Sequence, residues 1–315
     1  MEAVINVVLP VFAIVGSGYL TGRFKILGIE ASPVLSSFVF YIALPALLFI
    51  AMTRVSPDKI FDWAFIGTYS ISLLIGLALT MGVMKLFYPS RRLAESALAG
   101  MGAIYGNTGY MGIPLVMIAF GPDAMVPAVI ATVVNTAVIF CLVCSIVETD
   151  LSIGDGAVGI AKDVLLGLIK NPLFVSPIAG IAVSIIGVNV PSSISAFCDI
   201  LGAAAGPCAL FSLGLFMVGK KLSKDASEVA LIAAIKLFVL PGMCWIMITW
   251  VFDLSPLWGA VAIIMTALPT GTGAFVLAQR YKVYDDQISA VTLVSTIVSI
   301  ITLSVLFSLF TGIGV

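Results

Sequence analysis

The sequence predicts an all-α polytopic membrane protein with ten transmembrane helices in two inverted five-helix repeats. Three observations predict this fold class: the composition, the number of long apolar segments and a match between the two halves of the chain. Of the 315 residues, 61% are hydrophobic and 10% are charged, and the mean hydropathy is +1.21. Soluble domains carry roughly 25% charged residues, so the chain is predicted to lie in a membrane.

Ten segments are long enough to cross a bilayer, which takes about 20 mainly apolar residues. They are residues 4–22, 31–52, 63–86, 93–119, 124–147, 163–187, 193–219, 227–251, 257–281 and 287–312. The first segment lacks a basic beginning and a small-residue cleavage site. We therefore interpret it as a retained transmembrane helix and not as a signal peptide.

Basic residues in the connecting loops predict the orientation, because cytoplasmic loops are enriched in lysine and arginine. One alternate set of loops holds only Arg54 and Lys59. The other set holds Arg23, Lys25, Lys85, Arg91, Arg92, Lys162, Lys170, Lys220, Lys221, Lys224, Arg280 and Lys282. The second set is predicted to be cytoplasmic, which places both termini outside the cell in a multi-pass plasma membrane protein.

The two halves of the chain correspond without gaps when 162 is added to each position of the first half. The matched residues include Pro10 with Pro172, Gly18 with Gly180, Pro45 with Pro207, Thr108 with Thr270, Gly109 with Gly271 and Asp123 with Asp285. Each half holds five predicted helices, an odd number, so the second copy is inverted relative to the first. The predicted repeats are residues 1–148 and 163–315, joined by a short cytoplasmic linker at 149–162.

Proline and glycine interrupt several of these helices, and two interruptions lie at matching places. The fourth segment contains "GNTGYMGIP" and the ninth contains "ALPTGTGAF" at residues 267–275; the second and seventh also carry Pro or Gly-rich breaks. Irregular backbone survives within a membrane only against protein or a water-filled cavity. The two matching breaks therefore predict two broken helices that meet, and their free N–H ends suit a carboxylate. The alternative, kinks that serve only packing, explains one such break better than two.

Polar residues elsewhere in the apolar segments extend the candidate site. Lys236 lies about 13 Å into the eighth segment at 1.5 Å per residue, where a lysine is expected to face the protein interior. It could neutralise helix carbonyls at the crossing or the charge of a substrate, or extend to the cytoplasmic surface. Thr132 and Asn135 share a helix face and fit a polar pathway or an interhelical hydrogen bond equally. Asp199 fits a gate or a solvated helix start.

The sequence also excludes several kinds of function. It has no histidine, and its five cysteines all fall in apolar segments, so we expect no metal site and no cofactor. The net charge of -1 gives no reason to expect a nucleic-acid partner. An intramembrane aspartyl protease needs two membrane aspartates, and only Asp199 qualifies. A sodium/proton antiporter would place acidic residues at the crossing, where Asn107, Thr108 and Pro269 stand here.

Four ordered motifs resemble the auxin efflux carrier family, which includes plant PIN carriers and bacterial permease-like proteins for malonate and malate. The motifs are "NTGYMGIPL" (107–115), "LIKNPLFVSPIAGI" (168–181), "ALFSLGLFM" (209–217) and "ALPTGTGAFVLAQRYKV" (267–283). The resemblance implies a sodium/proton antiporter-like or bile acid symporter-like fold. Helices one, two, six and seven would form a dimerising scaffold, and helices three to five and eight to ten a mobile transport domain.

The resemblance also implies elevator-type secondary transport of small organic anions, such as auxin-like monocarboxylates or malonate- and malate-type dicarboxylates. By motif match, Asn107 and Pro114 are crossover residues of the fourth helix and Pro269 of the ninth, while Thr132 lies near a position that is polar in plant members. A sodium-coupled organic anion symporter of the bile acid symporter type is the alternative. Expected partners are the organic anion, membrane lipid and a second copy of the chain. The candidate substrate-binding residues are Asn107, Thr108, Gly109, Tyr110, Pro114, Thr132, Asn135, Lys236, Pro269, Thr270, Gly271 and Thr272.

Overall fold

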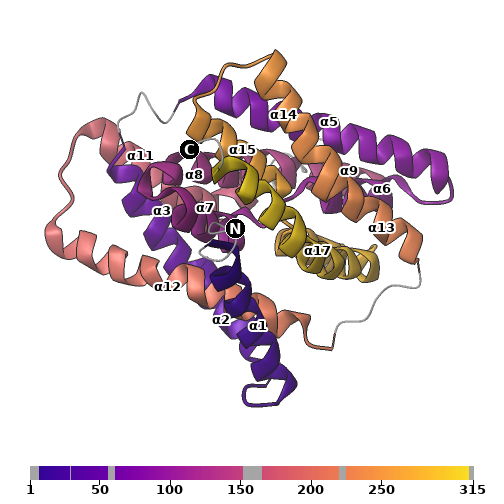
Figure 1. Cartoon of the computed structure of the whole chain (residues 1–315), viewed down its shortest axis with the longest axis horizontal. Helices are drawn as coiled ribbons and strands as arrows, with labels where there is room; N and C mark the ends of the chain where they lie inside the picture. Colours follow the sequence, from indigo (N-terminus) through magenta and orange to yellow (C-terminus); the bar gives the residue numbers. More distant parts are fainter. Residues whose placement is uncertain (1–6, 29, 56–60, 152–164, 220–224, 312–315) are drawn as a thin grey trace.

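The computed structural model describes residues 7–28, 30–55, 61–151, 165–219 and 225–311. Within these ranges the chain is helical, and its one extended feature is an isolated antiparallel bridge between Gly106 and Thr270 (Figure 1). Several predicted features lie outside the described residues. They are the linker beyond Leu151, the ends of three predicted helices at residues 4–6, 163–164 and 312, and the basic residues Lys59, Lys162, Lys220, Lys221 and Lys224.

The first half of the chain forms helices that follow the predicted segments closely. They are α1 (Leu9–Arg23), α2 (Ala31–Phe38), a π-helical turn (Val39–Ala43), α3 (Leu44–Thr53), α5 (Trp63–Phe87), α6 (Leu93–Ile104), a π-helical turn (Thr108–Gly112), α7 (Ile113–Phe120), a 3₁₀ turn (Pro122–Ala124), α8 (Met125–Val134), a π-helical turn (Asn135–Ile139) and α9 (Phe140–Asp150).

The described residues of the second half of the chain also form helices. It contains α11 (Pro172–Ile186), α12 (Ser192–Met217), α13 (Ala226–Ala234), a π-helical turn (Ile235–Val239), α14 (Leu240–Trp250), α15 (Pro256–Ala267), α16 (Thr272–Tyr281) and α17 (Asp285–Thr311).

Within the described part of the chain, six continuous helical stretches are long and apolar enough to cross a membrane. They are Ala31–Thr53, Trp63–Phe87, Pro122–Asp150, Ser192–Met217, Ala226–Trp250 and Asp285–Phe310. Four shorter apolar helices accompany them: Leu93–Ile104, Thr108–Phe120, Pro172–Ile186 and Pro256–Ala267. The molecule is therefore a multi-pass helical membrane protein.

The predicted interruptions of the second and seventh segments are wrong, because both segments form continuous helices. Ala31–Thr53 passes through a π-helical turn at Val39–Ala43, and Pro45 lies just after this turn without ending the helix. Helix α12 continues through Pro207. Its nearby glycines serve close packing: a Cβ added at Gly202 would lie 3.1 Å from Leu47 Cδ1.

The helices pack in two groups (Figure 1). The α12 group contains α1, α2, α3, α11 and α12, which pack mainly on one another. The α17 group contains α5 to α9 and α13 to α17, and its principal contacts are also internal. Helix α7 and the π-helical turn before it lie where the two groups meet, because that turn packs on α12 as well as on α8.

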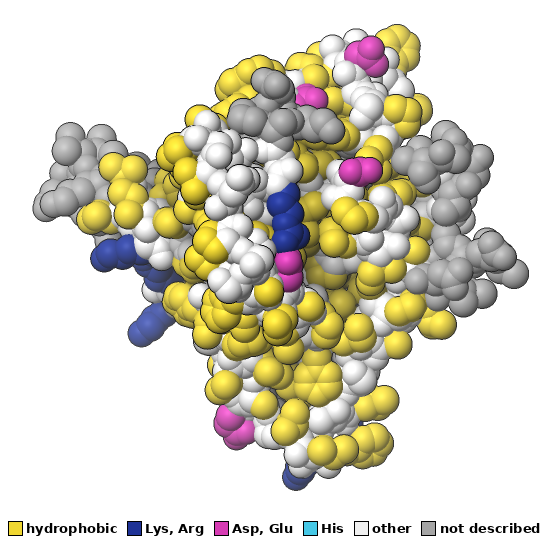
Figure 2. Space-filling model, turned by 90° about the vertical axis from the view of Figure 1, so that its left-hand side faces the viewer, with side chains coloured by type: hydrophobic (Ala, Val, Ile, Leu, Met, Phe, Trp, Pro, Cys, Tyr) yellow, Lys and Arg dark blue, Asp and Glu magenta, His cyan; other side chains and the backbone are white. Residues whose placement is uncertain are grey.

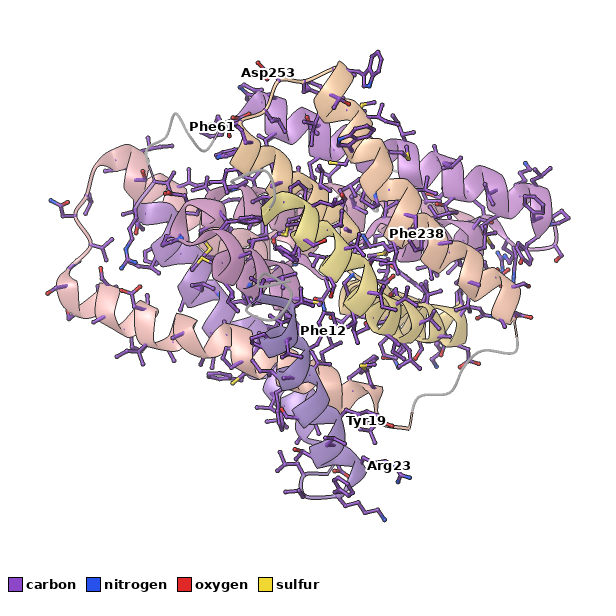
Figure 3. The ribbon with its side chains drawn as sticks, viewed as in Figure 1. Phe12, Tyr19, Arg23, Phe61, Phe238 and Asp253 are labelled. Carbon is purple, nitrogen blue, oxygen red and sulfur yellow. The ribbon has the colours of Figure 1, made fainter. Side chains whose placement is uncertain are left out.

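The outer surface is predominantly apolar. Figure 2 shows one face covered largely by hydrophobic side chains, with few charged ones. Aromatic side chains point outward along the helices, including Tyr19 on α1, Phe61 before α5 and Phe238 between α13 and α14 (Figure 3). Phe238 is 60% exposed. Such a surface suits hydrocarbon and not water.

Candidate substrate-binding site

The interruptions of the fourth and ninth predicted helices lie directly against each other. The amide of Asn107 donates to the carbonyl oxygen of Pro269 at 2.9 Å, and the amide of Gly271 donates to the carbonyl oxygen of Tyr105 at 2.8 Å. These two bonds form the antiparallel bridge around Gly106 and Thr270. Each broken helix thus satisfies backbone groups of the other, which is how irregular backbone can persist within an apolar bundle.

Lys236 lies beneath this crossing and contacts the carbonyl ends of both broken helices. Its side chain is completely buried. Its Nζ donates to the carbonyl oxygen of Thr266, in the last turn of α15, at 2.8 Å. It also lies 3.4 Å from the carbonyl oxygen of Ile104, the last residue of α6. Of the three interpretations of Lys236, the structure supports neutralisation of helix carbonyls, and the extension to the surface is wrong.

Thr270 and Pro269 make hydrogen bonds that stabilise the crossing. The hydroxyl of Thr270 donates to the carbonyl oxygen of Gly102 at 2.6 Å, and its amide donates to Ser295 Oγ at 3.1 Å. Pro269 contributes the carbonyl oxygen that accepts from Asn107. Thr270 therefore joins the segment after α15 to α6 and α17, and Pro269 joins it to the other broken helix at Asn107.

A cavity of ≈ 340 Å³ opens beside the crossing. Seven of the twelve predicted site residues line it: Asn107, Thr108, Gly109, Tyr110, Thr132, Gly271 and Thr272. The other five do not: Pro114 packs on α12, and Asn135, Lys236, Pro269 and Thr270 lie among the surrounding helices. The remaining walls come from Ser36, Ser37, Phe40, Tyr41, Tyr105, Gly106, Thr136, Phe140, Asn171, Leu173, Gly273 and Val276.

The electrostatic character of this cavity comes from backbone and neutral side chains. Among its described lining residues there is no lysine, arginine, aspartate or glutamate. Two helical segments begin at its wall, at Thr108 and at Thr272. The amides of a first helical turn have no partner within the helix and carry partial positive charge. The two helix beginnings thus contribute partial positive charge to a wall that bears no formal charge among its described residues.

Asn107, at this wall, and Asn135, behind it, each carry a side-chain atom without a hydrogen-bond partner among the described residues. Asn107 is 4% exposed, and its Nδ2 has no hydrogen-bond partner among the described residues. The Nδ2 of Asn135 lies 3.3 Å from the hydroxyl of Tyr69 and 3.5 Å from that of Thr108, while its Oδ1 has no partner in the described part of the chain. A buried polar atom without a partner is costly, and of the two side chains only that of Asn107 belongs to the cavity wall.

Sequence reasoning found Tyr110 but missed the other aromatic residues of the cavity wall. Thr136 could have been found, because it lies one turn after Thr132, and Tyr105 precedes the broken segment directly. Phe40 and Tyr41 come from the second predicted helix and Phe140 from the fifth. The sequences of these two helices give no indication that the helices meet at the crossing.

A second cavity, of ≈ 1020 Å³, lies at the opposite end of the contact between the two groups. Asp199 lines it together with Arg54, whose Nη2 lies 2.6 Å from the aspartate Oδ2. Asp199 is therefore an ion-pair partner and not simply a solvated helix start. Figure 2 shows the molecule from its left-hand side in Figure 1, where a basic side chain lies beside an acidic one in a furrow between apolar surfaces.

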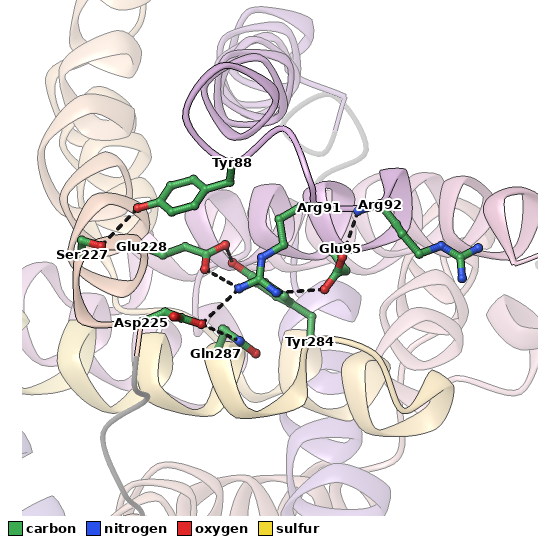
Figure 4. Close-up of polar contacts among 9 residues, drawn as sticks. All are labelled: Tyr88, Arg91, Arg92, Glu95, Asp225, Ser227, Glu228, Tyr284 and Gln287. Atoms are coloured by element: carbon green, nitrogen blue, oxygen red, sulfur yellow. Dashed lines mark hydrogen bonds and ion pairs between the residues drawn. The ribbon is translucent and has the colours of Figure 1, made fainter.

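A polar network joins three helices at the predicted cytoplasmic end (Figure 4). Glu228 is fully buried and accepts hydrogen bonds from Arg91 Nη2, at 2.7 Å, and from the hydroxyl of Tyr284. Arg91 also contacts Glu95 and Asp225 at 3.1 Å each. The hydrogen bond from Arg91 to Glu228 raises the pKa of Arg91, and burial raises the pKa of Tyr284. The network ties the beginnings of α6, α13 and α17 together, which gives Arg91 and Glu95 a structural role.

A multi-pass helical bundle with a cavity beside two interrupted helices is an arrangement typical of membrane transporters. The family model described as "Membrane transport protein" matches residues 3–155 and 156–307. The chain belongs to this family, the auxin efflux carrier family, which consists of membrane transporters and not of enzymes.

Curated relatives agree with the family along most of the chain. The chain is 31% identical over 312 residues to a protein of Rhizobium meliloti named "Putative malonate transporter", covering 96% of this chain and 95% of the relative. It is 24% identical over 299 residues to the transporter YfdV of Escherichia coli, covering 93% of both. It is also 31% identical over 138 residues to auxin efflux carrier component 1 of Arabidopsis thaliana, covering 42% of this chain and 22% of the relative.

Proposed function

We propose that the protein is a secondary transporter of small organic anions and that the cavity beside the crossing binds the substrate. One observation carries this proposal. Two helix beginnings, at Thr108 and Thr272, lie at one cavity whose described lining residues include Asn107, with its unpartnered Nδ2, and no charged side chain. Preorganised amide donors at helix N-termini suit a carboxylate.

The walls favour a substrate with one carboxylate and an apolar body. Phe40, Tyr41, Tyr105, Tyr110 and Phe140 line the cavity beyond the helix beginnings. A second carboxylate would lie against these rings, where a charge without a partner is costly. We therefore propose preferential binding of monocarboxylates, although the relative from Rhizobium meliloti is named for malonate.

The proposed architecture is that of two five-helix inverted repeats, residues 1–148 and 163–315. The α12 group corresponds to the proposed scaffold and dimer interface, and the α17 group to the proposed transport domain, which moves in an elevator manner. The separate internal packing of the two groups supports this division. We place the protein in the plasma membrane with both termini outside, on the basis of the loop charges.

Sodium-coupled symport is the second candidate, because the Oδ1 of Asn135 is a buried oxygen without a donor among the described residues. Such an oxygen suits a cation as well as a water molecule. Counterflow measured in sodium and in potassium buffers separates the two candidates.

A thermal-shift screen of the purified protein tests the substrate proposal, with phenylacetate as a monocarboxylate and malonate as a dicarboxylate. We expect phenylacetate to raise the melting temperature more than malonate does at equal concentration. Stabilisation by malonate alone would contradict the preference for one carboxylate. Stabilisation by neither, across a wider series of organic acids, would contradict the proposed function.

A further inference from the structure

The two cavities lie on opposite sides of one contact between the helix groups. Ser37 of α2 and Thr108 of the broken helix both line the smaller cavity, one from each group. Ala51 of α3 and Met117 of α7 both line the larger cavity, again one from each group. Residues of both helix groups therefore line each cavity. The residues between the two cavities separate two routes of access to the contact between the groups.

Pro114 occupies this intermediate position. It follows Tyr110, which lines the smaller cavity, and precedes Met117, which lines the larger one. It packs against Gly206 of α12 so closely that a Cβ at Gly206 would lie 3.1 Å from the Cβ of Pro114.

Two further contacts hold the same segment against the α12 group. A Cβ at Gly109 would lie 3.5 Å from Leu44 Cδ1. Leu44 is completely buried and lies between Tyr41, at the smaller cavity, and Leu47, at the larger one. The hydroxyl of Tyr110 also donates to the carbonyl oxygen of Ser36 at 3.1 Å.

We propose that the Pro114–Gly206 contact, together with the Tyr110–Ser36 hydrogen bond, is the seal between the two cavities, and that the transport step moves this contact. The inference rests on the proposed transporter function. Gly206 has no side chain that would obstruct Pro114 as the contact moves. A neutral hydrogen bond contributes only about 0.5–1.5 kcal/mol, so it can break and reform during a transport cycle.

Disulfide crosslinking tests this proposal with a closely matched control on the same helix. Pro114→Cys with Gly206→Cys would join the two groups across the seal. Leu47→Cys with Gly202→Cys would join two helices of the α12 group, and a Cβ at Gly202 lies 3.2 Å from the Cβ of Leu47. Both separations are slightly shorter than the roughly 3.5–4.5 Å between the Cβ atoms of a disulfide, so a small outward shift allows either bond to form. Both pairs are placed in a chain whose five natural cysteines are replaced by alanine.

The first readout is uptake of phenylacetate by vesicles before and after oxidation, and again after reduction. We expect the crosslink across the seal to abolish uptake and reduction to restore it, whereas the control crosslink leaves uptake unchanged. Continued uptake with the seal crosslinked would overturn the proposal, and so would equal inhibition by the control crosslink.

The second readout does not depend on the substrate. Thr132 lines the smaller cavity, and a Thr132→Cys variant is labelled with an impermeant maleimide added to one side or the other of vesicles of defined orientation. We expect labelling from both sides without the seal crosslink and from one side with it. Identical labelling with and without the crosslink would overturn the seal. The expected labelling without uptake of any organic acid would contradict the proposed function and leave the seal supported.

Discussion

The backbone amide of Asn107 donates a 2.9 Å hydrogen bond to the carbonyl oxygen of Pro269, which joins the two interrupted helices of the bundle. The reciprocal bond runs from Gly271 to Tyr105 at 2.8 Å. The two bonds satisfy backbone groups that would otherwise be stranded within apolar surroundings. The first-turn amides after Thr108 and Thr272 are left beside the cavity, where an anion can use them.

Replacing Lys236 with methionine should destabilise the crossing and abolish transport. The substitution keeps an unbranched apolar chain but removes the donor to the carbonyl oxygens of Thr266 and Ile104. An unsatisfied buried acceptor costs roughly 1–3 kcal/mol, so the melting temperature should fall. Lys85→Met, at the exposed end of α5, is the control and should behave like the natural chain. Unchanged stability and uptake in Lys236→Met would contradict this account of the lysine.

Asn107→Asp should weaken anion binding more than Asn107→Ala does. Both variants remove the unpartnered Nδ2, but aspartate also places a carboxylate where the proposed substrate carboxylate would lie. Titration of phenylacetate into each purified variant measures the affinity, and membrane abundance is compared in parallel. Equal affinity in Asn107→Asp and the natural chain would remove this side chain from the site.

Thr270→Val should lower stability and transport together, whereas Thr270→Ser should preserve both. The valine has a similar shape but cannot donate to the carbonyl oxygen of Gly102, which the threonine hydroxyl contacts at 2.6 Å. Thermal unfolding and uptake of the two variants check the prediction. An equal loss of stability and uptake in the serine and valine variants would contradict a role for the hydroxyl at this position.

The buried carboxylate of Glu228 should contribute much more stability than the half-exposed carboxylate of Asp199. Glu228→Gln replaces a fully buried carboxylate that accepts from Arg91 and Tyr284, which should cost roughly 1–3 kcal/mol. Asp199→Asn breaks a pair whose side chains are 55% and 48% exposed, worth about 0–1 kcal/mol. Comparing the two melting temperatures tests this difference, and similar values would contradict it.

The same network should not respond to pH between about pH 6 and pH 9 through Arg91 or Tyr284. The pKa values of both groups are raised in the folded protein. A raised pKa gives stability that is fully present below the unfolded pKa and is lost only as pH rises above it. The melting-temperature difference between Glu228→Gln and the natural chain should therefore stay constant across this range. A steep decline toward pH 9 would show that another group controls the network.

The helices and their two matching breaks could be predicted because apolar length and backbone chemistry are local properties. "GNTGYMGIP" and "ALPTGTGAF" contain their own signals, and both lie at real interruptions. Pro207 carries the same signal, yet α12 continues through it because neighbouring helices support the backbone. A proline alone therefore does not distinguish a tolerated kink from a broken helix.

The candidate site could be predicted only in part, because a cavity wall depends on which helices become neighbours. Tyr110 and Thr132 line the cavity as expected, whereas Thr270 turns its hydroxyl toward Gly102. Phe40 belongs to a helix distant in sequence, and nothing in its own segment indicates the contact. Burial of Glu228 was equally hidden, because its partners Arg91 and Tyr284 lie in the turns that precede α6 and α17.

The most direct measurement is calorimetric titration of the purified protein with phenylacetate and with phenylacetamide, its uncharged amide. The two ligands have nearly the same shape, but only the acid presents a carboxylate to the amides beside Thr108 and Thr272. We predict that the acid binds and that the amide binds at least about tenfold more weakly, a difference of about 1.4 kcal/mol or more. Equal affinity for both ligands would contradict recognition of an anion at this crossing.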